Sequence, residues 1–243
     1  QVYLNHAAAS PISTKVKEAL DDYYSTRTYE KPGNWSETVR IASEFKTIFA
    51  NMINAESPDR IAFTQNTTHG LNIIASGLQW EQGDQILLPE HEFPANVYPF
   101  KNLAKKGVEI KYLPTSEGGL KPETLQANIS ARTKLLSLSF VEYLSGYKHD
   151  LEVLGKICKE HDIIFIVDSI QGVGAIPLDV RRCYIDGLAN GGHKWLMAPQ
   201  GIGLLYVTKE LQNKIKQSQL GWTGLENFQD FQNYDRKLLE TAG

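Results

Sequence analysis

The chain has few cysteines and no long apolar run. Its 243 residues include only two cysteines, Cys158 and Cys183, which are far apart and lack the spacing of metal ligands. This pattern excludes a disulfide framework and a cysteine-based zinc site, so we predict no metal centre, and it is typical of a reducing compartment. The longest strongly apolar run, 163–167, is much shorter than the ~20 residues that span a bilayer.

An excess of charge is also lacking. The chain has 25 basic and 28 acidic side chains, which give a formal net charge of -3. This balance leaves no excess of positive charge that would attract nucleic acid or an anionic membrane, so we expect neither as a partner. The N-terminal residues lack the basic and apolar regions of a signal peptide, and we therefore expect a cytoplasmic protein. Its 42% hydrophobic residues are ordinary for a globular domain with a sizeable core.

The hydrophobic pattern alternates between the two periods of secondary structure. Strand-like runs occur at 60–64, 85–88, 108–113, 134–140 and 163–167, with segments of helical period at 68–76, 96–106 and 151–161. This alternation predicts a mostly parallel sheet that is covered by helices on both faces. Beyond Pro177, two apolar runs at 185–189 and 202–207 are joined by a glycine-rich loop without a helical crossover. We expect an antiparallel strand there.

Two of these strands end in polar residues that could bind a ligand. Asp168 directly follows the apolar run 163–167, where a carboxylate is costly to bury without a cationic partner. Taken alone, this favours a capping or salt-bridged aspartate. Asn66, Thr67 and Thr68 stand between a strand and a helix, where backbone N–H groups and hydroxyls can bind phosphate, although threonine is also a routine helix N-cap.

Lys194 stands out because of its neighbours. Most lysines are solvated surface charges, but Lys194 follows a glycine pair and His193 and precedes Trp195. A lysine amine, an aspartate at a neighbouring strand end and a phosphate cradle are together what pyridoxal phosphate requires. A dinucleotide site at QGVGA is rejected, because the third glycine of that fingerprint is absent and Pro177 interrupts the expected helix.

Four segments carry a family resemblance: FTQNTTHGLN, PEHEFPANVYPF, IVDSIQGVGAIPLDV and IDGLANGGHKWLMAPQGIGLLYV. In this order and spacing the chain resembles the class V aminotransferases, which are fold-type I pyridoxal-phosphate enzymes. That family includes cysteine desulfurases, selenocysteine lyases, kynureninases and epimerase-like members, and the match runs from about Tyr3 to Asp235.

The resemblance implies a fold and a domain division. The fold is a three-layer α/β large domain with a mostly parallel, mixed sheet. Residues 1–30 are expected to form an N-terminal arm, 31–215 the cofactor-binding large domain, and 216–243 the start of a connection to a C-terminal small domain that is absent or truncated. In the family, that small domain supplies a substrate-carboxylate arginine and, in desulfurases, a loop cysteine.

The resemblance also implies the catalytic residues. Lys194 matches the lysine that binds the cofactor as a Schiff base and moves the substrate Cα proton. Asp168 matches the carboxylate that keeps the pyridine nitrogen protonated, and Gln171 matches the residue that binds the ring hydroxyl.

The remaining cofactor contacts are carried over in the same way. His193, Thr67 and Thr68 match phosphate-binding positions, whereas a serine common in the family is replaced by Gly191. Phe93 is expected to stack on the cofactor ring.

For several other residues, the sequence predicts only a place in the fold. His91 is expected to be a loop residue, Cys158 a core residue and Cys183 part of a connector. Asn5 and His6 could approach the pocket, although a helix-entry role before Pro11 is favoured.

The reaction is the least determined part of the prediction. We expect an enzyme that acts on a small amino acid through an external aldimine and is most similar to an aminotransferase, with a 2-oxo acid as possible acceptor. Desulfurisation of cysteine or selenocysteine, epimerisation and a non-catalytic scaffold remain as alternatives. Phe93, and Tyr143 with Ser145 where many desulfurases have an asparagine, favour amino transfer. A homodimer is expected, because active sites of the family are completed at a subunit interface.

Overall fold

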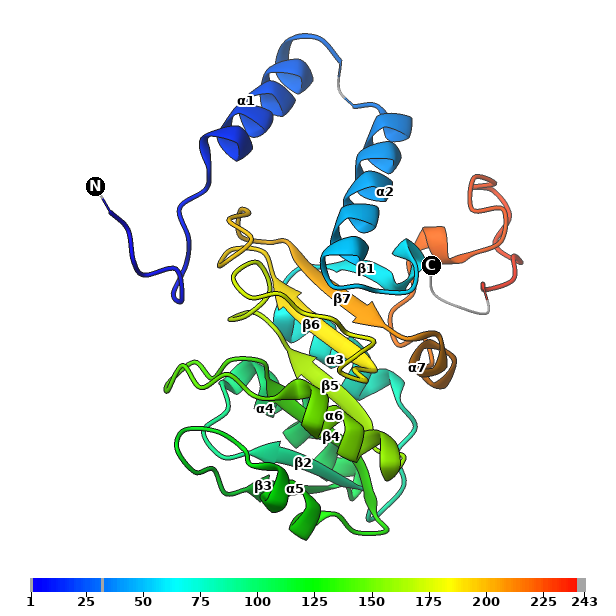
Figure 1. The fold of residues 1–243 in the computed structure, drawn as a ribbon. Coiled ribbons are helices and arrows are strands. Elements are labelled where there is room, and N and C mark those ends of the chain that lie inside the picture. The colour runs from blue at the N-terminus through cyan, green and yellow to red at the C-terminus, as the bar shows by residue number, and fades with distance from the viewer. Residues whose placement is uncertain (1, 32, 240–243) are drawn as a thin grey trace.

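A computed structural model describes residues 2–31 and 33–239 and contains one mixed sheet (Figure 1). The strands are β1 (Ile61–Thr64), β2 (Gln85–Pro89), β3 (Glu109–Leu113), β4 (Thr133–Ser139), β5 (Ile164–Asp168), β6 (Gly187–Gly191) and β7 (Gly203–Val207). Their order in the sheet is β1-β7-β6-β5-β4-β2-β3. β7 pairs antiparallel with both β1 and β6, and the other pairs are parallel. The predicted antiparallel strand is therefore confirmed.

Helices cover both faces of this sheet. The α-helices of the described residues are α1 (Thr14–Tyr29), which stands away from the sheet, α2 (Trp35–Met52), α3 (Thr67–Gly77), α4 (Pro94–Lys101), α5 (Pro122–Asn128), α6 (Leu151–Glu160) and α7 (Lys209–Lys214). Successive side chains of β5 alternate between the faces, because side chains of a strand point to opposite sides in turn. Phe165 packs in the apolar cluster that contains α2 and α6 residues, and Ile166 packs in the cluster that contains α3 and α4 residues. The result is the predicted three-layer α/β architecture.

Two short helices were missed by the sequence pattern. α5 has 7 residues and α7 has 6, so neither is long enough to repeat an apolar stripe. Each buries a single leucine, Leu125 in α5 and Leu211 in α7. The longer helices α3 and α6 lie where helical period was found.

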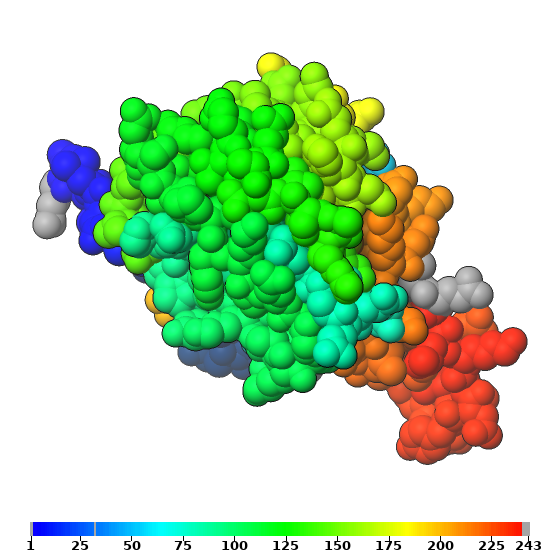
Figure 2. All heavy atoms as spheres, turned by 90° about the horizontal axis from the view of Figure 1, so that it is seen from below, coloured from blue at the N-terminus to red at the C-terminus, as the bar shows by residue number. Residues whose placement is uncertain are grey.

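The chain ends lie outside the three layers. No residue of α1 is buried, and α1 stands away from the sheet. The N-terminal and C-terminal segments project from opposite sides of the body (Figure 2). In the C-terminal segment, Trp222 contacts Phe228, Phe231 and Trp35 of α2. The predicted domain division stays a prediction, and its residues 1 and 240–243 lie outside the described part.

Within the described ranges, no helix combines the length and apolar composition needed to cross a bilayer.

Candidate functional site

The loops that follow five strands converge on one cavity of about 500 Å³. In open α/β sheets, ligands bind beyond the carboxyl ends of the parallel strands. Every site residue predicted from the sequence lines this cavity: Thr67, Thr68, Phe93, Asp168, Gln171, His193 and Lys194. The tertiary structure therefore brings together side chains from β1, β2, β5 and β6 that are widely separated in the sequence.

Asp168 ends β5 at the floor of the cavity and is 2% exposed. Its Oδ1 accepts the backbone N–H of Ile170 at 3.0 Å. Burial raises the pKa of Asp168 to about 7, opposed by the Ile170 hydrogen bond; the Glu92 charge raises this pKa further, whereas Lys194 lowers it. When ionised, this buried carboxyl strongly attracts a cation placed in the cavity.

Lys194 follows β6 and is half-buried in the same cavity. Burial lowers the pKa of its amine, and the Asp168 charge acts in the opposite direction. A lowered pKa increases the share of neutral amine, which is the form that attacks a carbonyl carbon. The Nζ atom lies 5.7 Å from the centroid of the Phe93 ring.

The N-terminus of α3 also lines the cavity. Asn66 is the N-cap, and its side-chain oxygen accepts the His69 N–H at 2.9 Å. The N–H groups of the next residues, Thr67 and Thr68, have no partner within the helix and lie at its positive end. Thr67 Oγ1 is buried with no hydrogen-bond partner among the described residues. An anion with several oxygens would satisfy these donors.

Two glycines allow this end of the site to be compact. A Cβ at Gly203 in β7 would lie 2.7 Å from the Asn66 Cα, so only glycine lets β7 approach the α3 N-terminus this closely. A Cβ at Gly191 would lie 2.7 Å from Ile170 Cδ1 and 3.2 Å from Thr67 Oγ1. Close packing therefore explains why glycine occupies position 191. A serine at this position would require Ile170 to move.

The N-terminal arm closes one side of the cavity. Gln171 donates to the Ala7 carbonyl at 2.9 Å and accepts from Trp195 Nε1 at 3.1 Å, and its amide retains a second N–H. Asn5 lines the cavity, whereas the His6 ring stacks on Trp195 with centroids 5.4 Å apart. The favoured helix-entry role of these two residues is wrong, because α1 begins later, at Thr14, and has Ser13 as its N-cap.

The third side is an aromatic wall. Phe93 and Tyr143 meet edge to face, with ring centroids 5.2 Å apart, and both line the cavity. His91 is exposed and has a left-handed backbone with φ of 68°, which agrees with its predicted place in a loop. Glu92 and Glu142, the residues before the two wall aromatics, are buried, and sequence reasoning missed both because nothing local distinguishes them from surface glutamates.

Neither cysteine lines this cavity. Cys158 is fully buried in the core, and burial raises the pKa of its thiol. Burial also raises the pKa of Cys183 to about 11. Both thiols are therefore protonated and inert near neutral pH.

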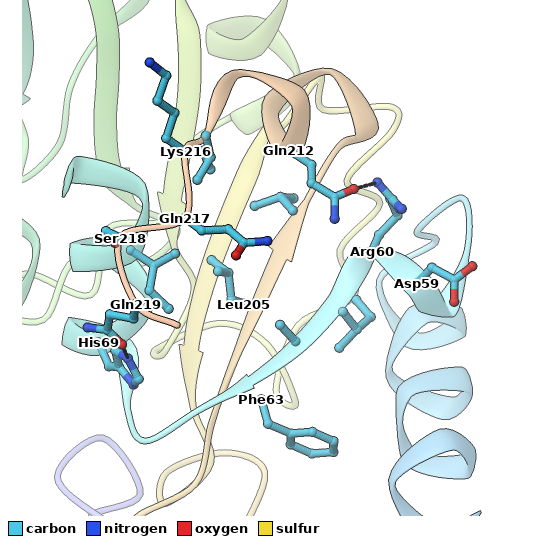
Figure 3. Close-up of a pocket in the computed structure, with 15 residues that line it drawn as sticks. Asp59, Arg60, Phe63, His69, Leu205, Gln212, Lys216, Gln217, Ser218 and Gln219 are labelled. Carbon is cyan, nitrogen blue, oxygen red and sulfur yellow. Dashed lines mark hydrogen bonds between the residues drawn. The ribbon is translucent and has the colours of Figure 1, made fainter. Parts of the chain in front are cut away.

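A separate, smaller pocket lies between β1 and residues 215–219 (Figure 3). Its polar contacts include Arg60 with Gln212 at 2.6 Å and His69 with Gln219 at 3.0 Å. None of the predicted site residues lines it. The chemistry predicted from the sequence therefore has one location in the described part of the chain.

Comparison with known proteins decides the family. The model of the aminotransferase class-V family matches residues 2–237. The chain belongs to this family. A probable cysteine desulfurase of Pyrococcus abyssi is 34% identical over 234 residues, which cover 93% of this chain and 58% of that protein. The chain therefore spans a little more than half the length of that class V relative.

Solved structures of the family share the fold. The apo structure of a cysteine desulfurase from Thermococcus onnurineus NA1 superposes with a TM-score of 0.86 at 29% identity, over 100% of this chain and 62% of that one. A variant of C-DES with glycine covalently linked to its pyridoxal-phosphate cofactor gives a TM-score of 0.85 at 26% identity, over 92% and 61%. The class V fold expected from the sequence is confirmed.

Proposed function

We propose that this class V chain binds pyridoxal phosphate through the Lys194 amine and acts on a cysteine-type amino acid. The observation that carries the proposal is the meeting in one cavity of Lys194, Asp168 and the α3 N-terminus. A lysine of lowered pKa, a buried carboxyl and an anion cradle match the aldehyde, the ring nitrogen and the phosphate of this cofactor. The C-DES relative, which carries this cofactor, supports the match.

Each end of the cofactor has a set of residues to hold it. The Thr67 hydroxyl and the free N–H groups at the start of α3 would bind the phosphate, together with Thr68 and His193. The Phe93 ring, which faces the Lys194 amine, would cover one face of the pyridine ring. When bound, the cofactor supplies an electron sink that stabilises negative charge at the substrate Cα.

The chain's own groups perform the proton steps. Lys194 lines the cavity, and burial lowers the pKa of its amine, so its Nζ would be able to accept the Cα proton of a bound substrate and return it. The Asp168 carboxylate would keep a proton on the ring nitrogen of the bound cofactor, because a nearby negative charge raises the proton affinity of such a nitrogen. Gln171, held by Ala7 and Trp195, would donate its second N–H to the ring hydroxyl.

The substrate class rests on the relatives. The first proteins reported by similarity, in Pyrococcus and Thermococcus, are described as cysteine desulfurases, one of them as probable. We therefore propose that the complete protein removes sulfur from cysteine or a related amino acid, and that it works as a homodimer. Amino transfer to a 2-oxo acid is the second candidate, and one observation favours it: Phe93 is the aromatic residue that faces the Lys194 amine in the cavity.

The cofactor assignment is tested by reduction with borohydride. Protein incubated with pyridoxal phosphate is reduced, digested and analysed by mass spectrometry, with Lys194→Ala compared with the surface variant Lys209→Ala. We expect one adduct, on Lys194, that is lost only in Lys194→Ala. A single adduct on another lysine would overturn the assignment.

The reaction is tested by supplying cysteine and alanine with and without a 2-oxo acid. Formation of alanine from cysteine together with a persulfide on a thiol, or with sulfide when a thiol reductant is added, and independent of any 2-oxo acid, supports sulfur removal. Conversion that requires the 2-oxo acid and leaves the cofactor in its amine form would replace it with amino transfer.

A further inference from the structure

Two buried glutamates lie beneath the aromatic wall of the cavity. Glu92, 6% exposed, follows β2, and Glu142, 3% exposed, follows β4. Glu92 is held by two hydrogen bonds from Ser139, which donates its N–H to Oε1 at 2.5 Å and its hydroxyl to Oε2 at 2.7 Å. Ser139 is the register partner of Asp168 across β4 and β5, so this contact lies directly beside the cavity floor.

Glu142 has no such donors. Neither of its carboxyl oxygens, both buried, meets an N–H or O–H group among the described residues. His149 Nε2 approaches Oε1 to 3.9 Å, but this nitrogen accepts the Leu120 N–H at 2.9 Å and so carries no proton. Glu142 interacts instead with the carboxyl of Glu92, the buried glutamate that follows the neighbouring strand β2. Two ionised carboxylates are both acceptors, so this contact requires a proton between them.

The charges around the pair indicate which glutamate carries that proton. Burial and the charges of Glu92 and Asp168 raise the pKa of Glu142 to about 9. Burial also raises the pKa of Glu92, but the Ser139 donors favour its ionised form. The other groups that bear on the site are Asn96, whose side chain also lowers the pKa of Glu92, the Lys194 amine, which offsets the Asp168 charge, and the neutral His149. Glu142 is therefore the neutral acid and Glu92 the carboxylate.

The pair joins two loops whose next residues form the wall. Phe93 follows Glu92, and Tyr143 follows Glu142. Their rings meet edge to face at 5.2 Å and 76°, and Phe93 also faces Lys194. The two loops come from β2 and β4, which are neighbours in the sheet.

We propose that Glu92 and Glu142 share one proton as an acid clamp, which fixes the loops after β2 and β4 so that Phe93 and Tyr143 stand as one wall facing Lys194. Both glutamates are positioning residues. The value of this wall for cofactor binding rests on the proposed function, whereas the clamp itself is a property of the chain alone.

The shared proton is detected by infrared spectroscopy of the cofactor-free protein at pH 8. At this pH Asp168, with a pKa of about 7, is mostly ionised, and Glu142, with a pKa of about 9, is mostly protonated. The difference spectrum between wild type and Glu142→Gln should contain the carbonyl band of a buried carboxylic acid. The surface control Glu160→Gln should show no such band. Absence of the band from the Glu142→Gln difference would overturn the clamp.

The effect on the wall is measured with two variants of the same residue. In Glu142→Gln the amide can donate to Glu92, so the contact between the Phe93 and Tyr143 rings, followed by nuclear Overhauser effects in the cofactor-free protein, should persist. In Glu142→Leu the donor is lost and this contact should weaken. An unchanged ring contact in a folded Glu142→Leu protein would overturn the clamp. If Glu142→Leu does not fold, Glu142→Gln decides the question. Loss of the ring contact in Glu142→Gln would overturn the clamp, and retention of the ring contact would support the clamp.

Cofactor affinity is a separate readout. Pyridoxal phosphate should bind Glu142→Gln within about twofold of wild type and Glu142→Leu about tenfold more weakly, a change of ~1.4 kcal/mol. Equal affinity in wild type and a folded Glu142→Leu would show that the clamp does not position the wall for the cofactor. If the wild type itself binds no pyridoxal phosphate, the proposed function fails, while the infrared and ring-contact measurements still decide the clamp.

Discussion

The Lys194 amine lies 5.7 Å from the centroid of the Phe93 ring. The two residues are 101 positions apart and belong to loops after β6 and β2, which are separated in the sheet by β5 and β4. Between the amine and the ring lies the cavity in which we place the cofactor.

Replacing Asp168 by asparagine should preserve cofactor binding and abolish most turnover. The neutral amide cannot keep the ring nitrogen protonated, and loss of such electrostatic stabilisation costs ~10²–10³ in rate. Cofactor absorbance and kcat of the complete protein measure the two effects. The control is Asp186→Asn, at the opposite end of β5, where the side chain accepts the Phe165 N–H. Normal turnover in Asp168→Asn would contradict the assignment.

Thr67→Val should separate stability from cofactor binding. The Thr67 hydroxyl is buried without a partner, so the isosteric valine should leave the free energy of unfolding of the cofactor-free protein unchanged or raise it by about 1 kcal/mol. Affinity for pyridoxal phosphate should fall at least about tenfold, because a hydrogen bond to a charged acceptor contributes ~1.5–3 kcal/mol. Urea unfolding and absorbance titration measure the two quantities. Thr47→Val on α2 is the control, and a clear loss of stability in Thr67→Val would refute the expectation.

Gly191→Ala should destabilise the fold mainly through its contact with Ile170. The added Cβ would lie 2.7 Å from Ile170 Cδ1, and because this atom ends a flexible side chain that can shift, the cost should lie near the lower end of the ~1–3 kcal/mol typical of overpacking. Ile170→Val removes that carbon, so the double variant Gly191→Ala/Ile170→Val should recover much of the loss. A double-mutant cycle of unfolding free energies measures this coupling. Strictly additive losses would show that the clash is elsewhere.

Acid should destabilise the chain through His149. Burial lowers the pKa of this imidazole from 6.5 to about 4, so between these values the unfolded chain binds a proton that the folded chain does not. The stabilisation is complete above pH 6.5 and is lost as the pH falls toward 4, with a slope of up to ~1.4 kcal/mol per unit. Urea unfolding as a function of pH measures this slope.

His149→Gln should unfold with a shallower dependence on acid. The glutamine oxygen can still accept the Leu120 N–H, but it does not titrate. His161→Gln, at the exposed end of α6, is the control and should keep the wild-type slope. The same steep slope in His149→Gln would assign the acid sensitivity to another group.

The alternation of strands and helices, and the polar residues that meet in the cavity, could be predicted from the sequence. Strands such as β5 are continuous apolar runs because both faces are buried, and Asp168 stands out because a charge directly follows such a run. Gly191, His193 and Lys194 lie close together in the sequence, so their motif can be recognised without the structure. The short helices α5 and α7 were missed because a helix of fewer than about two turns is too short to repeat the apolar pattern of a helix in its sequence.

The tertiary structure alone decided which distant residues meet. The Glu92 and Glu142 pair is an example, since a glutamate becomes a buried acid only when two neighbouring strands bring the loops that follow them together. Tyr143 joined Phe93 for the same reason. The sequence by itself determined the period of each element and the chemical groups at the strand ends, because these are local properties. Burial, pKa shifts and contacts between loops depend on the surrounding chain, and only the folded arrangement of the strands set them.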